Sequence, residues 1–196
     1  MYISNYEQLL SIIGQKVRNL EAGGSSERYV VAIDGNCGSG KTTGVRMIAE
    51  ALGCSIIQMD DFYLTPAMRT QKRRMEPGGN VNYERFKEEV LPFIKSREPF
   101  SYRKYDAPNN RFISDIEITS PDLVIVEGAY ALRPDLRADY DLCVFSKASY
   151  ELQVSRLSKR EGEFVEEYKN IWIPLENVYH EFFNLEKNVD IVVNVG

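Results

Sequence analysis

Gly35-Asn36-Cys37-Gly38-Ser39-Gly40-Lys41-Thr42 decides the fold, because this stretch satisfies the pattern G-x-x-x-x-G-K-[ST] between an apolar run (29–33) and a helix-favouring segment (43–52). In such a loop the glycines let backbone N–H groups turn inward toward phosphates, the lysine reaches the β and γ oxygens, and the next hydroxyl ligates Mg²⁺. The pattern therefore predicts a loop that binds a nucleoside triphosphate. The expected nucleotide-binding residues are Gly35, Asn36, Cys37, Gly38, Ser39, Gly40, Lys41, Thr42 and Thr43.

Composition narrows the class of protein. With 196 residues and 43% hydrophobic content, the chain has room for one sizeable core, so we expect a single domain over 1–196. A net charge of −5 provides no broad basic field for nucleic acid or an anionic membrane. Three cysteines without C-x-x-C spacing favour a reducing cytoplasm. We expect a cytoplasmic protein without nucleic-acid or membrane partners, because no apolar run approaches the roughly 20 residues that span a bilayer.

Apolar runs alternate with helical segments along the chain. The runs are rich in β-branched residues and lack period-two alternation, which is typical of strands buried on both faces. They cover 29–33, 55–59, 123–126, 142–145 and 190–193, and the helical segments cover 42–52, 82–95, 149–160 and 164–186, after an amphipathic N-terminal helix within 1–20. This order predicts an α/β fold, doubly wound, with a mainly parallel sheet of about five strands and flanking helices, as in P-loop NTPases.

Three segments interrupt this order. Residues 65–80 are polar and basic and end in Pro-Gly-Gly, which indicates a mobile loop. Residues 100–118 contain strand-forming residues on both sides of Pro-Asn-Asn, which indicates a hairpin arm for a substrate. Residues 156–166 carry Arg156 and Arg160 on one helical face before Gly162, which suggests a lid with a hinge.

Each basic cluster also has a simpler interpretation. Cations near the end of a helix are favoured by the helix dipole without any lid. We interpret the cluster of Arg69, Lys72, Arg73 and Arg74 first as a solvated mobile loop, and the alternative is recognition of an anionic group on the acceptor.

Acidic residues follow two of the apolar runs, at the sheet edge where ligands bind in open α/β folds. Asp60 and Asp61 follow the second run, and Glu127 follows the third. A hydroxyl that attacks a γ-phosphate needs a carboxylate to orient it and take its proton. Glu127 corresponds to a Walker-B acid that holds Mg²⁺ directly or through water. The alternatives are two turn-forming aspartates and a solvated glutamate that ends a strand, and the pattern leaves open whether Asp60 or Asp61 is the base.

In this order, the motifs GNCGSGKT, MDDFY, GGNVNYERF, RKYDAP, VIVEGAY and SRLSKREG resemble the uridine kinase and phosphoribulokinase family of P-loop small-molecule kinases. The resemblance covers nearly the whole chain after about residue 28. It implies ATP-dependent phosphoryl transfer to a hydroxyl, with Mg²⁺ near Thr42, Asp60 and Glu127. It also implies Lys41, Asp60, Arg156 and Arg160 as the catalytic set, and Asp60, Tyr63, Asn82 and Tyr105 as contacts to the acceptor.

Two departures from that family concern the acceptor. Asn82 stands where a nucleoside kinase carries an aspartate that grips the ribose hydroxyls, and Asn109 or Asn110 replaces a histidine that reads the pyrimidine. We therefore expect poor use of uridine and better use of another nucleoside or of a sugar-like or pantothenate-like alcohol. The alternative is a nucleotide-binding switch with little kinase activity, which needs no acceptor arms. The oligomeric state, including a homodimer, stays open.

Overall fold

The computed structural model describes residues 1–195 and is built around a six-stranded parallel sheet. All neighbouring strands in it pair in parallel, in the order β1-β8-β7-β2-β6-β3. The strands are β1 (Tyr2–Ile3), β2 (Tyr29–Gly35), β3 (Ser55–Gln58), β6 (Leu123–Glu127), β7 (Leu142–Lys147) and β8 (Ile191–Asn194). The five predicted strands are confirmed. The sequence did not reveal β1, because two residues are too few to form an apolar run.

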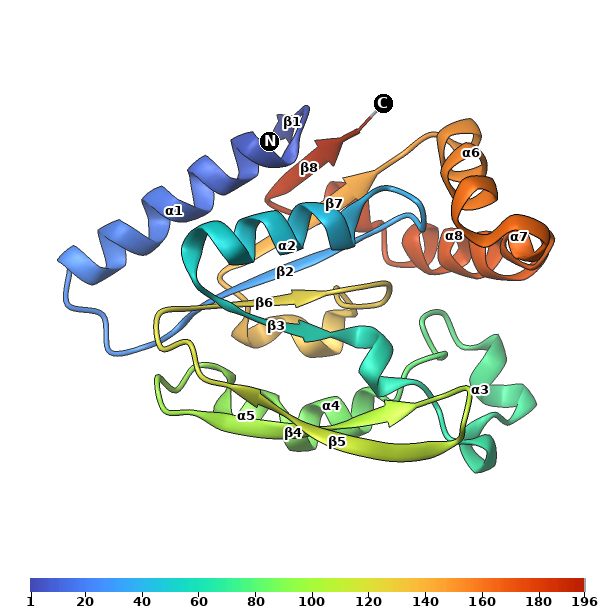
Figure 1. The fold of residues 1–196 in the computed structure, drawn as a ribbon, viewed down its shortest axis with the longest axis horizontal. Helices are drawn as coiled ribbons and strands as arrows, with labels where there is room; N and C mark the ends of the chain where they lie inside the picture. Colours follow the sequence, from blue (N-terminus) through green and yellow to red (C-terminus); the bar gives the residue numbers. More distant parts are fainter. Residues whose placement is uncertain (196) are drawn as a thin grey trace.

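Helices cover both faces of the sheet (Figure 1). Successive residues of a strand point to opposite faces, so Val31 and Ile33 of β2 pack against α1 and α2, while Val30 and Ala32 face the second core cluster. That second cluster contains residues of α4, α5 and α8. The helices are α1 (Tyr6–Ala22), α2 (Lys41–Leu52), α4 (Tyr83–Glu89), α5 (Leu91–Ile94) and α8 (Ile173–Phe182). The architecture is therefore doubly wound, as predicted.

The predicted helix over 149–160 is α6 (Tyr150–Glu161). The one over 164–186 is α7 (Val165–Glu167), a π-helical segment η5 (Tyr168–Trp172) and α8. Figure 1 shows α6, α7 and α8 gathered at the end of the sheet to which β2 and β6 point. Because ligands bind at the carboxyl ends of parallel strands, these helices stand beside the expected site. None of the helices formed by residues 1–195 is long and apolar enough to cross a bilayer.

Residues 100–118 form an antiparallel hairpin, separate from the main sheet, along its β3 edge (Figure 1). Its strands are β4 (Phe100–Asp106) and β5 (Arg111–Ile118). Tyr102 anchors the hairpin, because its ring stacks on Phe62 at 5.0 Å and its hydroxyl donates to Asp61 at 2.8 Å. The role of the hairpin as a substrate arm stays a prediction.

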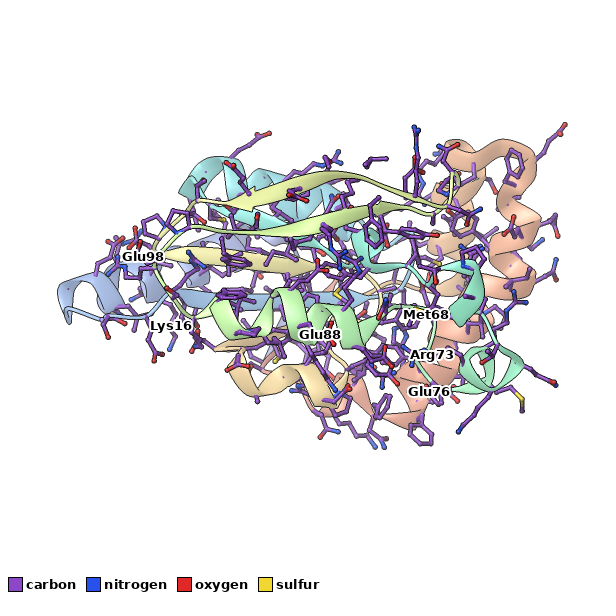
Figure 2. All side chains as sticks on the ribbon, turned by 90° about the horizontal axis from the view of Figure 1, so that it is seen from below. Lys16, Met68, Arg73, Glu76, Glu88 and Glu98 are labelled. Atoms are coloured by element: carbon purple, nitrogen blue, oxygen red, sulfur yellow. The ribbon has the colours of Figure 1, made fainter. Side chains whose placement is uncertain are left out.

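Residues 65–80 contain two short helical segments, η2 (Pro66–Met68) and α3 (Gln71–Met75). Arg73 organises this segment: its guanidinium donates to the carbonyl oxygens of Gly79 and Val81, both at 2.9 Å, and pairs with Glu84 at 2.7 Å. Figure 2 shows Arg73 and Glu76 close together at this end of the molecule. The segment thus has local structure, and its mobility stays a prediction. The remaining 3-10 segments are η1 (Met59–Phe62), η3 (Pro134–Asp139), η4 (Gly162–Phe164) and η6 (Leu185–Lys187).

Candidate active site

The phosphate loop joins the carboxyl end of β2 to the first turn of α2. Gly38 and Gly40 have φ angles of 71° and 88°, which L side chains rarely adopt, and a side chain at Gly35 would collide with the backbone of Ser146. Lys41 Nζ donates to the carbonyl oxygens of Gly35 and Asn36 at 2.8 and 3.1 Å, so its charge lies inside the curl of the loop.

The loop also contains a donor without a partner. Ser39 Oγ is buried and forms no hydrogen bond to any other described residue. An unpartnered hydroxyl in a loop that curls around a lysine and precedes the start of a helix fits a bound polyphosphate anion, because helix N-termini and such loops attract negative charge. The residues present therefore fit the phosphates of ATP.

Thr42 and Glu127 meet beside the loop. Thr42 Oγ1 donates to Glu127 Oε1 at 3.3 Å, and Glu127 is buried. Burial raises the pKa of Glu127 and Asp60 adds to the rise, while Lys41 opposes it. Within residues 1–195 no group of three or more histidines, cysteines or acids is arranged to hold a metal. A hydroxyl and one carboxylate fit Mg²⁺ of the kind that takes its other ligands from phosphates and water.

The two neighbouring aspartates after β3 have different surroundings. Asp60 is exposed, and its Oδ1 accepts a hydrogen bond from the Tyr63 hydroxyl at 2.9 Å. Asp61 is buried, accepts from Tyr102 at 2.8 Å and pairs with Lys104 at 3.0 Å. Asp61 is therefore occupied in anchoring the hairpin, and Asp60 is the carboxylate that remains accessible to an acceptor.

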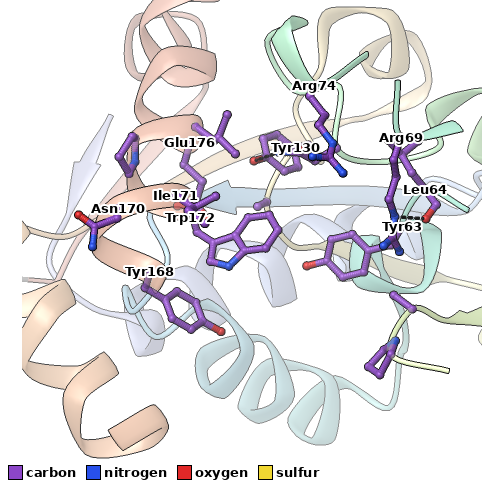
Figure 3. A pocket seen from close by; sticks show the side chains of 16 residues that line it. Tyr63, Leu64, Arg69, Arg74, Tyr130, Tyr168, Asn170, Ile171, Trp172 and Glu176 are labelled. Carbon is purple, nitrogen blue, oxygen red and sulfur yellow. Dashed lines mark hydrogen bonds between the residues drawn. The ribbon is translucent and has the colours of Figure 1, made fainter. Parts of the chain in front are cut away.

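A cavity of about 870 Å³ lies beside these groups (Figure 3). Residues from five separate parts of the chain line it: the stretch after β3, the 65–80 segment, the tip of the hairpin, the loop after β6 and the segment that enters α8. Its walls are largely apolar, with four aromatic residues among them, and its charged groups are few, as in most small-molecule sites. The aromatic residues are Tyr63, Tyr130, Tyr168 and Trp172, and the charged ones are Arg69, Arg74 and Glu176.

Of the four residues expected at the acceptor, Tyr63 lines this cavity, whereas Asp60, Asn82 and Tyr105 do not. Asp60 is linked to the lining through its hydrogen bond from Tyr63. The Asn82 side chain caps α4, accepting from the Arg85 N–H at 3.0 Å, and its amide nitrogen contacts the sulfur of Met68. The hydroxyl of Tyr105, which is buried, donates to Asn110 Oδ1 at 3.4 Å. The tip of the hairpin contributes Ala107 and Pro108 to the lining instead. Acceptor binding by Asn82 and Tyr105 stays a prediction.

The two expected lid arginines also differ. Arg156 Nη1 donates to the carbonyl oxygen of Gly38 at 3.1 Å, so this guanidinium lies on the phosphate loop. Arg160 pairs with Glu161 at 2.5 Å, and its guanidinium lies 5.8 Å from the centre of the Tyr168 ring. Arg156 therefore contacts the loop, whereas Arg160 pairs with Glu161 at the end of α6 and lies near Tyr168 of η5.

Sequence analysis missed two buried acids at the loop. Asp34 accepts from the N–H groups of Gly35 and Leu132 and from the Tyr179 hydroxyl, at 2.7, 3.0 and 2.8 Å. Burial raises the pKa of Asp34, and these donors together with Lys41 oppose the rise. An acid between an apolar run and the phosphate loop was the available signal for Asp34.

The second missed acid is Glu176, whose Oε2 accepts from the backbone N–H of Cys37 at 2.7 Å. Burial raises the pKa of Glu176, and Lys41 is the strongest influence that lowers it. Nothing in the sequence around residue 176 distinguishes this glutamate from a surface residue of a helix, because only the packing of α8 brings it to the loop.

Comparisons with known proteins show what the chain is similar to. No family model matches it. A uridine kinase of Halobacterium salinarum is 24% identical over 185 residues, covering 86% of this chain and 80% of that protein. A uridine kinase of Ligilactobacillus salivarius is 27% identical over 190 residues, covering 85% of each.

Two solved structures share the fold. The structure of a possible uridine kinase from Bacillus stearothermophilus aligns with a TM-score of 0.66 at 21% identity, covering 95% of this chain and 99% of that one. D-glycerate 3-kinase from Cryptococcus neoformans aligns with a TM-score of 0.61 at 14% identity, covering 96% and 95%. These structural likenesses establish the fold alone.

Proposed function

Because the chain belongs to the uridine kinase-like family of P-loop small-molecule kinases, we propose that it transfers the γ-phosphoryl group of ATP to a hydroxyl of a small metabolite. The observation that carries the proposal is the contrast between the two aspartates. The carboxylate of Asp60 is accessible, whereas that of Asp61 is bonded to Tyr102 and Lys104. Asp60 lies close enough to Glu127 for its charge to raise the pKa of that group, and Glu127 in turn contacts Thr42 of the phosphate loop. An accessible carboxylate near the phosphate loop can orient an acceptor hydroxyl and take its proton.

The residues divide the reaction among them. The N–H groups of the loop and Lys41 bind and orient the phosphates, and Arg156 adds positive charge over Gly38. Thr42 and Glu127, with Asp60 nearby, would hold Mg²⁺, which would supply positive charge to the phosphates when bound. Asp60 orients the acceptor hydroxyl and takes its proton as the new O–P bond forms and the bond from the γ-phosphorus to ADP breaks, so that ADP leaves. Such proton transfer contributes about 10²- to 10⁴-fold.

The cavity indicates the chemistry of the acceptor. The arginines of the 65–80 segment have different surroundings. Arg73 is bound to Gly79 and Glu84, whereas Arg69 and Arg74 line the cavity. Arg69 donates only to the Leu64 carbonyl, and among the described residues neither Arg69 nor Arg74 forms an ion pair. Free guanidinium groups in an aromatic cavity favour an anionic acceptor, since arginine binds carboxylate and phosphate in a forked geometry.

We therefore place hydroxy acids and other anionic alcohols, pantothenate-like compounds among them, ahead of uridine. D-glycerate, the substrate named for one structural neighbour, belongs to the same chemical class. A nucleotide switch needs neither an accessible Asp60 nor a cavity of about 870 Å³ beside the loop. The kinase is the better account of both features.

A screen tests the proposal. The protein is incubated with Mg·ATP and a panel of alcohols that contains uridine, D-glycerate, pantothenate and neutral sugars, and alcohol-dependent formation of ADP is measured. We expect the anionic alcohols to exceed uridine. A kcat/KM for uridine of about 10⁴ M⁻¹s⁻¹ or more, with clear preference over the other alcohols, would instead establish a uridine kinase.

A further inference from the structure

Glu176 occupies part of the phosphate loop. Its Oε2 accepts from the Cys37 N–H at 2.7 Å, and its side chain is 6% exposed. The same side chain lines the acceptor cavity (Figure 3). Glu176 thus lies between the loop expected to hold the nucleotide and the cavity expected to hold the acceptor.

Glu176 lies among the groups of the loop that would bind the phosphates of a nucleotide. Burial raises the pKa of Glu176, the charge of Lys41 lowers it, and the charge of Asp34 raises it. Inward N–H groups of a phosphate loop and its lysine form a site for an anion, and in this structure a carboxylate of the protein takes one of those N–H groups. A terminal phosphate that arrives at the loop meets a negative charge already placed there.

We propose that Glu176 is a positioning residue that competes with the terminal phosphate of ATP for the phosphate loop, so that ATP binding releases the first turn of α8 and resets one wall of the acceptor cavity. The inference rests on the proposed binding of ATP. It explains how a filled nucleotide site prepares the cavity for its acceptor, since both sites share one side chain.

The segment before Glu176 connects the first turn of α8 to the wall of the cavity. Residues Tyr168–Trp172 form a π-helical stretch, and π-helical turns are rare and concentrate at functional sites. Tyr168 and Trp172 of this stretch line the cavity, as does Pro174 of α8. Movement of the first turn of α8 therefore changes the position of two aromatic walls of the cavity.

Nucleotide binding measured by titration calorimetry tests the proposal, with the β,γ-imido analogue of ATP and with ADP, both in the presence of Mg²⁺. Glu176→Gln keeps the size of the side chain and an oxygen for the Cys37 N–H, but removes the charge. We expect it to bind the triphosphate analogue at least about fivefold more tightly than the wild type, the lower end of coupling between linked sites, with a smaller gain for ADP. Glu21→Gln, an exposed residue of α1 that lines neither the acceptor cavity nor a pocket at the phosphate loop, is the matched control and should change neither affinity.

The direction of the effect separates competition from a merely structural role. Unchanged or weaker analogue binding by Glu176→Gln would overturn the proposal, because the loss of a purely structural contact is not expected to increase the affinity for the nucleotide. Trp172 is the single tryptophan, so its quenching by acrylamide reports the wall of the cavity directly. In the wild type we expect the quenching to change when the analogue binds, and quenching that is the same with and without bound analogue would contradict the release.

Hydrogen exchange in the wild type tests the same inference without a variant. If Glu176→Gln does not fold, faster exchange of the amides at the start of α8 on addition of the analogue supports release, and slower or unchanged exchange contradicts it. A wild-type protein that binds no analogue at all, or binds it equally well as Lys41→Ala, would contradict the proposed function instead.

Discussion

The hydroxyl of Tyr179 donates to Oδ2 of Asp34 at 2.8 Å, and both side chains are fully buried. This bond joins α8 to the end of β2, directly before the phosphate loop. Because Gly35 and Leu132 donate to the same side chain, one buried carboxyl group connects β2, the loop after β6 and α8. The position of the loop relative to the cavity therefore depends on this group.

Tyr179→Phe removes one of the three donors to Asp34 and leaves the ring in place. Burial raises the pKa of Asp34, because a buried carboxylate loses its hydration. The loss of a donor leaves this buried carboxyl with one hydrogen bond fewer. We expect the free energy of unfolding to fall by about 1–3 kcal/mol, measured by urea denaturation. Tyr2→Phe, at an exposed tyrosine, is the control, and an equal effect of both changes would contradict the assigned role of the bond.

Asp60→Asn and Asp61→Asn should damage different properties. Asp60→Asn should lower kcat by about 10²-fold or more and change the affinity for Mg·ATP only a few-fold, because the lost group acts on the acceptor proton. Asp61→Asn should mainly lower stability, since it removes the charge that pairs with Lys104 and binds Tyr102. Steady-state kinetics and thermal unfolding check both, and the reverse pattern would make Asp61 the base.

Substitutions in the basic cluster should distinguish the arginines that bind the acceptor from the arginine that stabilises the fold. Arg69→Gln and Arg74→Gln should raise KM for an anionic acceptor by about tenfold or more, while turnover of a neutral alcohol changes little. Arg73→Gln should instead lower the melting temperature, because Arg73 holds Gly79, Val81 and Glu84. Equal losses with anionic and neutral alcohols would remove the arginines from acceptor recognition.

His180 predicts a pH dependence of stability. Burial lowers the pKa of His180 to about 3, and its ring contacts Phe145 at 4.9 Å. An unfolded histidine titrates near about 6.5, so between these values only the unfolded chain binds the proton. Stability from this group is complete above about pH 6.5 and falls as the pH is lowered toward 3, by at most about 1.4 kcal/mol per pH unit.

Denaturation of the wild type and of His180→Leu at several values between pH 7 and pH 4.5 measures this contribution. The wild type should lose stability more steeply than the variant on acidification. Parallel curves for the two proteins would show that His180 is protonated equally in the folded and unfolded chains.

The core strands and the phosphate loop could be predicted from the sequence because their signals are local. Strands such as Leu123–Glu127 are buried on both faces, so every residue of the run is apolar until the terminal acid. The loop needs glycine where φ is positive, as at Gly38 and Gly40. These constraints act on neighbouring residues and are visible in the order of the letters.

The site beyond the loop depends on tertiary packing. Arg73 and Arg74 are adjacent in sequence, yet one is consumed inside its own segment and the other lines the cavity. Glu176 resembles any glutamate of an amphipathic helix until α8 packs against the loop. Asn82 precedes a helix and caps it, a local signal that the resemblance to nucleoside kinases outweighed in our interpretation of the sequence.

The ratio of ADP to phosphorylated alcohol tests the central claim most directly. With the best acceptor of the screen, Mg·ATP and wild-type protein, the account predicts one phosphorylated alcohol for each ADP, and loss of both products by several orders of magnitude in Lys41→Ala. ADP and free phosphate formed at the same rate with or without any alcohol would contradict it, because such a protein would hydrolyse ATP without a hydroxyl acceptor.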